Sequence, residues 1–423
     1  MKILEVCEFY SERGGGVRTY VEQKFAAAAA CGVTLVVVAP GVEDRTEERP
    51  NGGKVIWVAS PHVPVDKRYC LFSDRKQIDD IVAAERPDFI EASSPWRGAW
   101  FAGRQAAEIP KALVLHQDPV STYPQTVLRH LLSYEQIDFS FGWFFSYLKR
   151  LQSLFDVSVA PSTWLSDRLQ SKGLIRPEVC AFGVDRSVFA KAERSEFMRR
   201  RLLRQCGIDD PSAKLLVTIS RYHPEKRLPL MFSAFEKASA TQKMGLIVFG
   251  DGPDRKNVEK HAAKTPHIHL AGFLNDRQQL AGMLASADAY IHAMPNETYG
   301  MAVAEALCAG APVIAPRAGG ILDFVNDQCA ELFERDDVDD FANAIRRLFT
   351  RDTEKLRAAA TTQATSIRNH QNHFFELFSL YSRLAGKPAP ALPEPMSVQD
   401  VDSVGDIFSP AKAAPIAKAV RIP

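Results

Sequence analysis

The sequence of 423 residues lacks the features of several common protein classes. Its seven cysteines are scattered, odd in number and without Cys-x-x-Cys spacing, which favours a reducing compartment and argues against structural zinc. No window approaches the ~18 uninterrupted apolar residues of a membrane span. Met1 leads directly into a predicted strand, so no signal peptide is expected. We therefore expect a cytoplasmic protein.

An excess of charge is also missing. Lys and Arg total 52, Asp and Glu total 51, and a net charge of +1 offers no general attraction for nucleic acid. An anionic substrate would therefore need a local binding site. No Asp-x-Asp motif and no cluster of histidines and carboxylates follows a predicted strand, so we expect no cofactor and no dedicated metal site.

Apolar segments alternate with helical patterns through two halves of the chain. Short apolar runs between helices are typical of a parallel, doubly wound α/β sheet. The strands predicted for the first half are 2–6, 34–39, 55–59, 88–91, 112–116, 156–160 and 178–182. Those of the second half are 215–220, 245–249, 268–270, 289–292 and 312–315. The predicted division is a first domain at 1–185, an interdomain segment at 186–212, a second domain at 213–385 and a disordered Pro/Ala-rich tail at 386–423.

The densest pattern is NETYGMAVAEALCAGAPVIAPRAGG, at residues 296–320. It predicts a turn, a helix over Met301–Cys308, a buried strand and a Gly-Gly turn. Glu297 lies at the helix entrance, and Glu305 lies ~9 Å along the helix axis from Tyr299. A helix N-terminus suits a diphosphate, and an inward carboxylate can accept two hydrogen bonds from a ribose diol. A helix with one solvated acid would show the same spacing.

With its surroundings, this stretch resembles the donor-site signature of the family 4 retaining glycosyltransferases, which belong to the group 1 enzymes. The resemblance is carried by Glu297-Thr-Tyr-Gly, Glu305-Ala-Leu, Gly310-Ala-Pro-Val and Gly319-Gly320. It covers about residues 1–385 and implies the GT-B architecture, in which two Rossmann-like doubly wound domains face a cleft. It also implies that Glu305 holds the ribose and that Glu297 orients the donor sugar. Backbone contacts to that sugar would come from Tyr299, Gly300 and Met301.

Two loops at strand ends are candidates for the diphosphate. Gly14, Gly15 and Gly16 follow the first strand and open a helix, so their backbone can approach a phosphate closely. Arg221 and Lys226 follow the first strand of the second half and form a natural pair for a diphosphate. Taken alone, the three glycines would also fit a flexible turn, and the loop with Arg221 and Lys226 would also fit a solvated basic turn. The resemblance favours binding by both loops, and we expect the adjacent Arg227 to be solvated.

Weaker candidates follow other strands. In the family, a loop like Gly250-Asp251 borders the nucleotide, although Asp251 alone is typical of a turn cap. Phe273 stands where relatives contact the base through the backbone. His116 stands where relatives contact the donor sugar, and Asp118 lies two positions further on. A lone histidine is otherwise more often structural.

The aromatic stretch DFSFGWFFSYLKRLQSLF, at residues 138–155, permits two structures. It could lie on a membrane surface with Lys149 and Arg150 at its polar edge, or form a buried helix over the sheet. In relatives that glycosylate lipids, this region serves the acceptor.

These patterns predict a metal-independent retaining glycosyltransferase with Glu297, His116, Arg221 and Lys226 at the reacting groups. The donor would be GDP-mannose, or a UDP-hexose as second choice, and the acceptor a glycan or a lipid-linked group. Peripheral contact with the inner membrane face is a further expectation. A GT-B sugar-nucleotide epimerase and an inactive nucleotide-sugar-binding relative are the alternatives. Intact glycines at 14–16 and His116 argue against an inactive relative.

Overall fold

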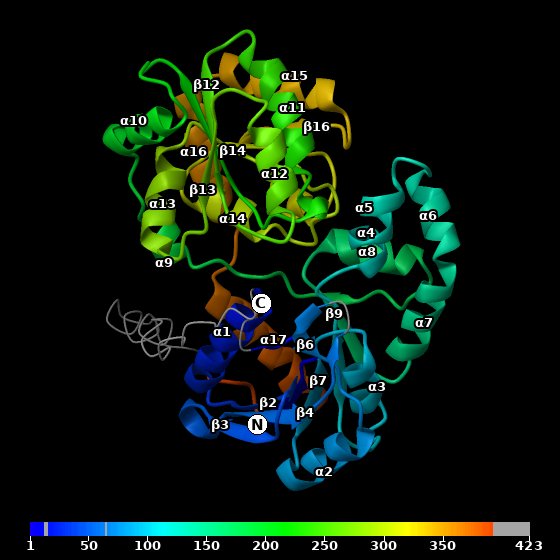
Figure 1. Ribbon diagram of the computed structural model, residues 1–423. Helices are drawn as coiled ribbons and strands as arrows, with labels where there is room; N and C mark the ends of the chain where they lie inside the picture. Colours follow the sequence, from blue (N-terminus) through cyan, green and yellow to red (C-terminus); the bar gives the residue numbers. More distant parts are fainter. Residues whose placement is uncertain (12–15, 64–65, 392–423) are drawn as a thin grey trace, which may run out of the picture.

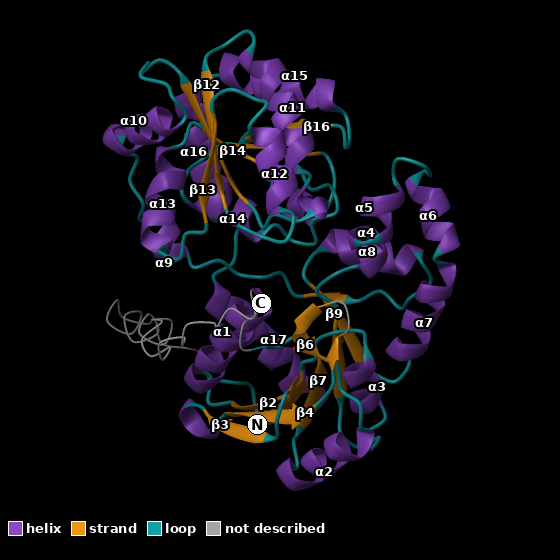
Figure 2. Cartoon of the chain, viewed as in Figure 1, coloured by secondary structure: helices purple, strands orange, loops and turns teal. Residues whose placement is uncertain are grey.

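The computed structural model describes residues 1–11, 16–63 and 66–391, so Gly14, Gly15 and the residues after 391 lie outside the described part. Two α/β halves face each other in Figure 1, the N-terminal half below and the C-terminal half above. A group of helices in the first half, α4 to α8, projects toward the second half on the right of the view. Figure 2 shows the two separate sheets and the helices around each of them.

The first half is built on an eight-stranded sheet with the order β10-β9-β8-β7-β1-β2-β4-β3. Its strands are β1 (Lys2–Val6), β2 (Thr34–Gly41), β3 (Arg45–Glu48), β4 (Lys54–Ala59), β7 (Phe89–Ala92), β8 (Lys111–Val114), β9 (Val157–Ala160) and β10 (Glu178–Val179). All neighbours pair in parallel except the edge strand β3, which is antiparallel to β4. A separate antiparallel hairpin joins β5 (His62–Val63) and β6 (Asp66–Cys70).

The second half is built on a six-stranded, fully parallel sheet with the order β13-β12-β11-β14-β15-β16. Its strands are β11 (Lys214–Ile219), β12 (Met244–Phe249), β13 (Ile268–Gly272), β14 (Ala289–Ile291), β15 (Val313–Pro316) and β16 (Ala330–Phe333). In both sheets the strands that follow helices pair in parallel, which confirms the predicted α/β class.

Helices cover both faces of each sheet. Those before residue 185 are α1 (Gly16–Ala30), α2 (Arg75–Glu85), α3 (Arg97–Gly103), α4 (Pro119–Thr122), α5 (Pro124–Leu128), α6 (Tyr134–Ser140), α7 (Gly142–Gln152) and α8 (Thr163–Ser171). The later ones are α9 (Arg186–Phe189), α10 (Glu196–Gln205), α11 (Leu228–Ser239), α12 (Arg255–Ala262), α13 (Arg277–Ser286), α14 (Met301–Cys308), α15 (Val338–Thr350), α16 (Thr353–Ala364) and α17 (His370–Leu384). Short 3₁₀ turns are η1 (Pro50–Gly52), η2 (Pro224–Lys226) and η3 (Gly320–Asp323).

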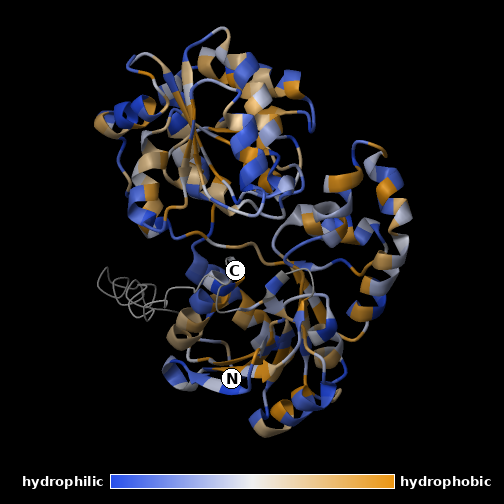
Figure 3. Cartoon of the chain, viewed as in Figure 1, coloured by the Kyte–Doolittle hydropathy of each residue, from blue (hydrophilic) through white to orange (hydrophobic). Residues whose placement is uncertain are grey.

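The central strands are apolar because each is buried on both faces. All six residues of β12, MGLIVF, are buried, and so are all four of β15. Two apolar clusters sandwich each sheet, and the strands between them are orange in Figure 3. Strands β3 and β16 were not predicted, because RTEE and AELF are short and carry charge.

The last helix, α17, completes the first half and not the second. Its Phe374, Leu377, Phe378 and Tyr381 belong to the apolar cluster of α1, β1 and β2. The orange α17 accordingly lies beside the blue α1 in Figure 1. Residues 366–370 lead the chain from the second half back to the first. In this connection Val184 N donates to Arg368 O at 2.9 Å. The expected range 213–385 for the second domain therefore does not describe one packed unit.

The segment expected to be an interdomain linker, 186–212, packs on the second half. Leu202 and Leu203 of α10 are buried in its core. Arg199, on the same helix, is 5% exposed and donates from Nη2 to Asp288 Oδ2 at 2.8 Å. The four arginines at 197–205 are typical of a solvated helix, but Arg199 among them neutralises a buried aspartate of the second half.

A charged network is sealed inside the first half. Lys24 of α1 contacts Glu5 of β1 at 2.8 Å and Glu91 of β7 at 2.5 Å, and all three side chains are fully buried. The hydroxyl of Tyr381 donates to Glu91 at 2.9 Å, which anchors α17 to the sheet. The network thus joins the beginning and the end of the described chain.

Candidate functional site

The loop before α14 and the Gly-Gly turn after β15 press their backbones together. Gly320 N donates to Glu297 O at 2.7 Å, and a Cβ at Gly320 would meet Thr298 O at 2.2 Å. Gly300 has a φ of 97° and precedes the first residue of α14, as predicted for a helix over Met301–Cys308. The glycines of the motif are therefore needed to bring Glu297 and the start of α14 to one place.

Glu297, in the loop before α14, forms an ion pair with Lys226, in the loop after β11. Lys226 Nζ lies 2.8 Å from Glu297 Oε2, and His292 Nε2 lies 3.8 Å from the same oxygen. Burial opposes ionisation of Glu297, but the charge and hydrogen bond of Lys226 outweigh it, and the pKa of Glu297 is lowered. Burial lowers the pKa of His292 to about 4, so this ring is neutral at physiological pH. The site thus holds a paired lysine and glutamate whose side chains are about one-fifth exposed, at 21% and 17%.

Arg221 lies at the same strand end but points further into solvent. Its Nη2 is 3.4 Å from Glu225 Oε1, and its side chain is 55% exposed. Glu225 is itself 5% exposed. Arg221 and Lys226 therefore supply one exposed and one half-buried cation at the carboxyl end of β11, where open α/β sheets bind ligands.

Glu305 is one turn inside α14 and nearly buried. Its Oε1 accepts a hydrogen bond from Arg277 Nη2 at 2.9 Å. Burial raises the pKa of Glu305, and the charge of Arg277 opposes this rise. Arg277 was not predicted, because it lies 28 positions away on another helix and belongs to no motif.

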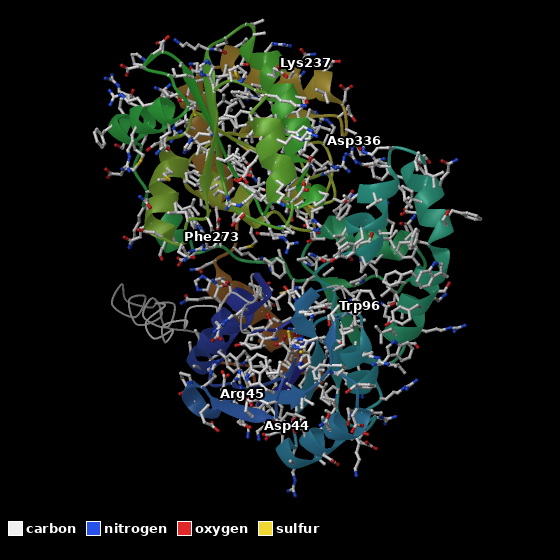
Figure 4. All side chains as sticks on the ribbon, viewed as in Figure 1. Asp44, Arg45, Trp96, Lys237, Phe273 and Asp336 are labelled. Atoms are coloured by element: carbon white, nitrogen blue, oxygen red, sulfur yellow. The ribbon has the colours of Figure 1, made fainter. Side chains whose placement is uncertain are left out.

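The loop after β12 comes close to the same strand end. Gly250 has a φ of 135°, and a Cβ there would meet Ser220 O at 1.9 Å. Asp251 accepts from Gly252 N at 2.7 Å and pairs with Arg255 at 2.8 Å, which is the turn-cap role that its residue type suggested. Phe273 is 71% exposed, and Figure 4 places it at the edge of the second half that faces the first.

His116 follows β8 in the first half and lies among aromatic rings. Its ring centroid is 5.1 Å from that of Tyr20 and 5.6 Å from that of Phe182. Burial lowers the pKa of His116 to about 4, so it is neutral at physiological pH. Phe182 also contacts Tyr299, with ring centroids 5.7 Å apart. Tyr299 is 4% exposed, so its ring packs in the interior and leaves only its backbone for a ligand.

Asp118 does not fit its predicted role as a substrate contact. It is completely buried, Oδ1 accepts from Val120 N at 2.9 Å, and Oδ2 accepts from Arg168 Nε. Arg168 continues to Asp138 with hydrogen bonds of 2.9 and 3.0 Å. Asp118 is therefore the N-cap of α4 and part of an ion network that holds α4, α6 and α8 together.

The helices from α4 to α8 contact the second half through three sets of hydrogen bonds and ion pairs, among the described residues. Asn296 Nδ2 donates to Ser121 O at 3.1 Å and to Gln125 Oε1 at 3.0 Å. Thr163 N donates to Asp323 Oδ2 at 2.6 Å. The third set surrounds Asp336, at the second-half edge nearest α5 and α6 in Figure 4.

In this third set, Asp336 contacts Arg129, Tyr134 and Arg227, and Arg227 Nη2 donates to Tyr134 Oη at 2.9 Å. Arg227 is 3% exposed, so the expectation that it is solvated was wrong. The residue after Lys226 thus holds the two halves together.

The aromatic stretch 138–155 has a buried face, as expected for a helix over the sheet, and an exposed face; contact with a membrane stays a prediction. Phe144, Phe145, Leu148 and Leu151 of α7 are buried in the core of the first half. Phe139 and Trp143 are 89% and 66% exposed. Lys149 and Arg150 are exposed on the same helix as Trp143.

Three second-half candidates follow strand ends, namely Arg221, Lys226 and Gly250. Glu297 precedes α14, and Glu305 lies one turn inside this helix. Of the predicted glycine loop, Gly16 is described as the exposed first residue of α1. Within the described ranges, no group of three or more His, Cys, Asp and Glu side chains is arranged to hold a metal ion. Nor does any described helix have the length and apolarity needed to cross a membrane.

Sequence comparison matches each half separately. Residues 14–188 match Glycosyltransferase Family 4, and residues 202–366 match Glycosyl transferases group 1. The chain is 25% identical over 372 residues to the GDP-mannose-dependent alpha-(1-6)-phosphatidylinositol dimannoside mannosyltransferase of Mycobacterium tuberculosis, covering 86% of this chain and 92% of the relative. It is 28% identical to a GDP-mannose-dependent alpha-mannosyltransferase of Corynebacterium glutamicum, covering 77% and 75%. Sucrose-phosphate synthase from Thermosynechococcus elongatus shares the fold with a TM-score of 0.69 and 16% identity, over 91% of this chain and all of that structure.

Two Rossmann-like halves, with charged residues gathered at the strand ends of the second, define the GT-B architecture. The fold and the two sequence matches together place the chain among the group 1 glycosyltransferases with the GT-B fold, and it resembles the mannosyl-transferring members.

Proposed function

We propose that this glycosyltransferase moves mannose from GDP-mannose to a lipid-linked or glycan acceptor, with retention at the anomeric carbon and without a metal ion. A UDP-hexose is the second candidate donor. The names of the two mannosyltransferase relatives support the choice of GDP-mannose. The observation that carries the proposal is the contact of Lys226 with Glu297 at the entrance of a helix that also carries Glu305.

In this proposal the donor diphosphate lies at the carboxyl end of β11, against Arg221 and Lys226. Arg221 is paired with Glu225, and Lys226 is paired with Glu297. A bound diphosphate would compete with these two glutamates for cations that the ion pairs hold in position. Preorganised cations stabilise the charge that develops on a leaving diphosphate. They would provide the positive potential that a metal ion provides elsewhere.

Retention is proposed to follow from attack on the face that the diphosphate leaves. The acceptor oxygen forms the new bond to the anomeric carbon as the bond to the diphosphate oxygen breaks, and the acceptor proton passes to the diphosphate. Glu297 is ion-paired and would stabilise positive charge on the sugar. His116, neutral at physiological pH, would donate or accept a hydrogen bond at the sugar.

The test begins with thermal melts in GDP-mannose and UDP-glucose, because a ligand at ~100 times its dissociation constant adds ~2.7 kcal/mol of stability. The better donor is then incubated with lipid-linked and soluble mannoside acceptors, with and without excess EDTA. We expect activity in EDTA and an α-linked product, recognised by the one-bond carbon–hydrogen coupling at the anomeric carbon. Loss of activity with EDTA would contradict metal independence, and a β-linked first product would contradict retention.

A lipid surface is the proposed location of the acceptor. The exposed Phe139 and Trp143 stand beside the cations Lys149 and Arg150, a combination suited to the interface of an anionic membrane.

A further inference from the structure

The ion pair of Glu305 and Arg277 extends from the interior of the second half to its surface. Among the described residues, Arg277 is the one side chain that donates a hydrogen bond to this carboxylate, at 2.9 Å. The Glu305 side chain is 10% exposed, whereas that of Arg277 is 42% exposed. Arg277 is therefore the member of the pair that solvent reaches more readily.

Arg277 is held in place independently of Glu305. It is the first residue of α13, whose N-cap Asp276 accepts from Gln279 N at 2.9 Å. Its guanidinium carbon lies 5.1 Å from the ring centroid of Phe189, which is fully buried. A planar guanidinium on an aromatic face has a fixed orientation, so its hydrogen bond fixes the orientation of the carboxylate as well.

The charge of Arg277 favours the ionised form of Glu305, against the effects of burial and of Asp185. Burial raises the pKa of Glu305, the charge and hydrogen bond of Arg277 lower it, and Asp185 raises it. The other titratable groups that face this carboxyl are Tyr290 on β14 and Cys308 on α14. His370 on α17 faces Asp185 and Arg277, and Arg186 faces Cys308. Arg277 is thus the cation in direct contact, and an ionised carboxylate is what accepts hydrogen bonds from both hydroxyls of a diol.

Building on the proposed function, we propose that Arg277 is a positioning residue of the nucleotide subsite, which keeps Glu305 ionised and directed at the ribose diol of the donor. A partly exposed ion pair contributes little to folding, so the arginine is of more use to the ligand than to the fold.

The experiment compares Arg277→Met and Arg277→Lys with wild type by calorimetric titration of GDP and of 2′,3′-dideoxy-GDP, which lacks the diol. Titrations run from about pH 8 to about pH 5, and UDP and its dideoxy analogue replace the guanine pair if wild type binds UDP more tightly. Arg200→Met is the matched control, because Arg200 pairs with the exposed Glu196 on α10 at 3.1 Å. Thermal melts check that every variant is folded.

We expect Arg277→Met to bind GDP about tenfold more weakly at neutral pH, in line with one charge-assisted interaction. The defect should grow as the pH falls, because the unpartnered carboxyl is then protonated. In Arg277→Lys, the affinity for GDP should depend on pH nearly as it does in wild type, since lysine keeps the positive charge. Affinity for dideoxy-GDP should be equal in wild type and both variants.

Wild-type affinity and pH dependence in Arg277→Met would overturn the inference while leaving the proposed function intact. An equal loss for GDP and dideoxy-GDP would also overturn it, because Arg277 would then contact the base or the diphosphate. A wild-type protein that binds neither nucleotide would refute the proposed function and this inference with it.

Discussion

The ion network in the core of the first half and the ion pairs of the candidate site in the second half differ in their access to solvent. In the first half, Lys24 and its two glutamates are completely sealed from solvent. In the second half, the pairs Lys226–Glu297 and Arg277–Glu305 each keep part of their surface exposed at strand and helix ends. A sealed pair can only hold the fold, whereas a pair that reaches solvent can exchange its partner for a ligand. In our proposal, the same residue types therefore serve stability in the sealed network and binding at the site.

Removal of Lys24 should give the largest effect, and it should fall on stability. Lys24→Met leaves Glu5 and Glu91 buried without their cation, which typically costs ~3–5 kcal/mol. Chemical denaturation should show this loss at neutral pH.

The loss should shrink at lower pH, and the sign follows from the carboxyls. Burial already raises the pKa of Glu91 to about 7 in the native protein, against an unfolded value of 4.5. A raised folded pKa means that stability falls as pH rises through this interval. Without Lys24 both carboxyls should behave in this way, so the variant should be most stable near the acid end. A variant as stable as wild type at neutral pH would show that the network is dispensable.

Removal of Lys226 should give the next largest effect, and it should fall on turnover. If the cation stabilises the leaving diphosphate, Lys226→Met should lower kcat by ~10²–10³ with little change in stability. The control is Lys237→Met, which removes an exposed lysine paired with Asp339 at 2.5 Å on the same half. Steady-state kinetics decide between the alternatives. A variant in which only KM rises would mean that Lys226 binds donor and transition state equally.

Removal of Glu305 should have a smaller effect. Glu305→Ala loses one charge-assisted interaction with the ribose, ~1.5–3 kcal/mol, which is roughly 10- to 100-fold in kcat/KM for the donor. Melts should show that the variant is folded, since only a partly exposed ion pair is lost. Wild-type kinetics in a folded Glu305→Ala protein would remove the ribose role.

The smallest effect on the purified protein should come from Trp143. Because this side chain is 66% exposed, Trp143→Glu should change stability by less than ~0.5 kcal/mol. It should nevertheless abolish sedimentation with vesicles of phosphatidylcholine and phosphatidylglycerol. Phe197→Glu, at a 76% exposed aromatic of the second half, is the matched control and should sediment as wild type does. Wild-type protein that stays in the supernatant would refute the membrane proposal.

The sequence predicted the architecture well because strands buried on both faces must be apolar throughout. The runs TLVVVAPG and MGLIVF could be recognised without any partner, and so could the helix over Met301–Cys308. Contacts between distant segments could not be predicted. Asp118 has the spacing of a ligand contact, but Arg168, 50 positions later, occupies it. Arg277 and Arg227 lack any pattern that distinguishes them from solvated arginines, and only the fold brings their partners close. The roles of the other site residues stay predictions.

The return of α17 to the first half has a consequence for synthesis on the ribosome. Chains emerge at ~5–20 residues per second, and domains usually fold in the order in which they emerge. Here the second half has its core residues, from Val184 to Ile367, before the helix at 370–384 is made. Until that point the first half lacks the core residues Phe374 to Tyr381. It also lacks the hydrogen bond from the Tyr381 hydroxyl to Glu91, which is the partner of the buried Lys24. The half that is translated first is therefore completed last, because the sheet of the nascent first half lacks the cover of α17 until residues 370–384 are available.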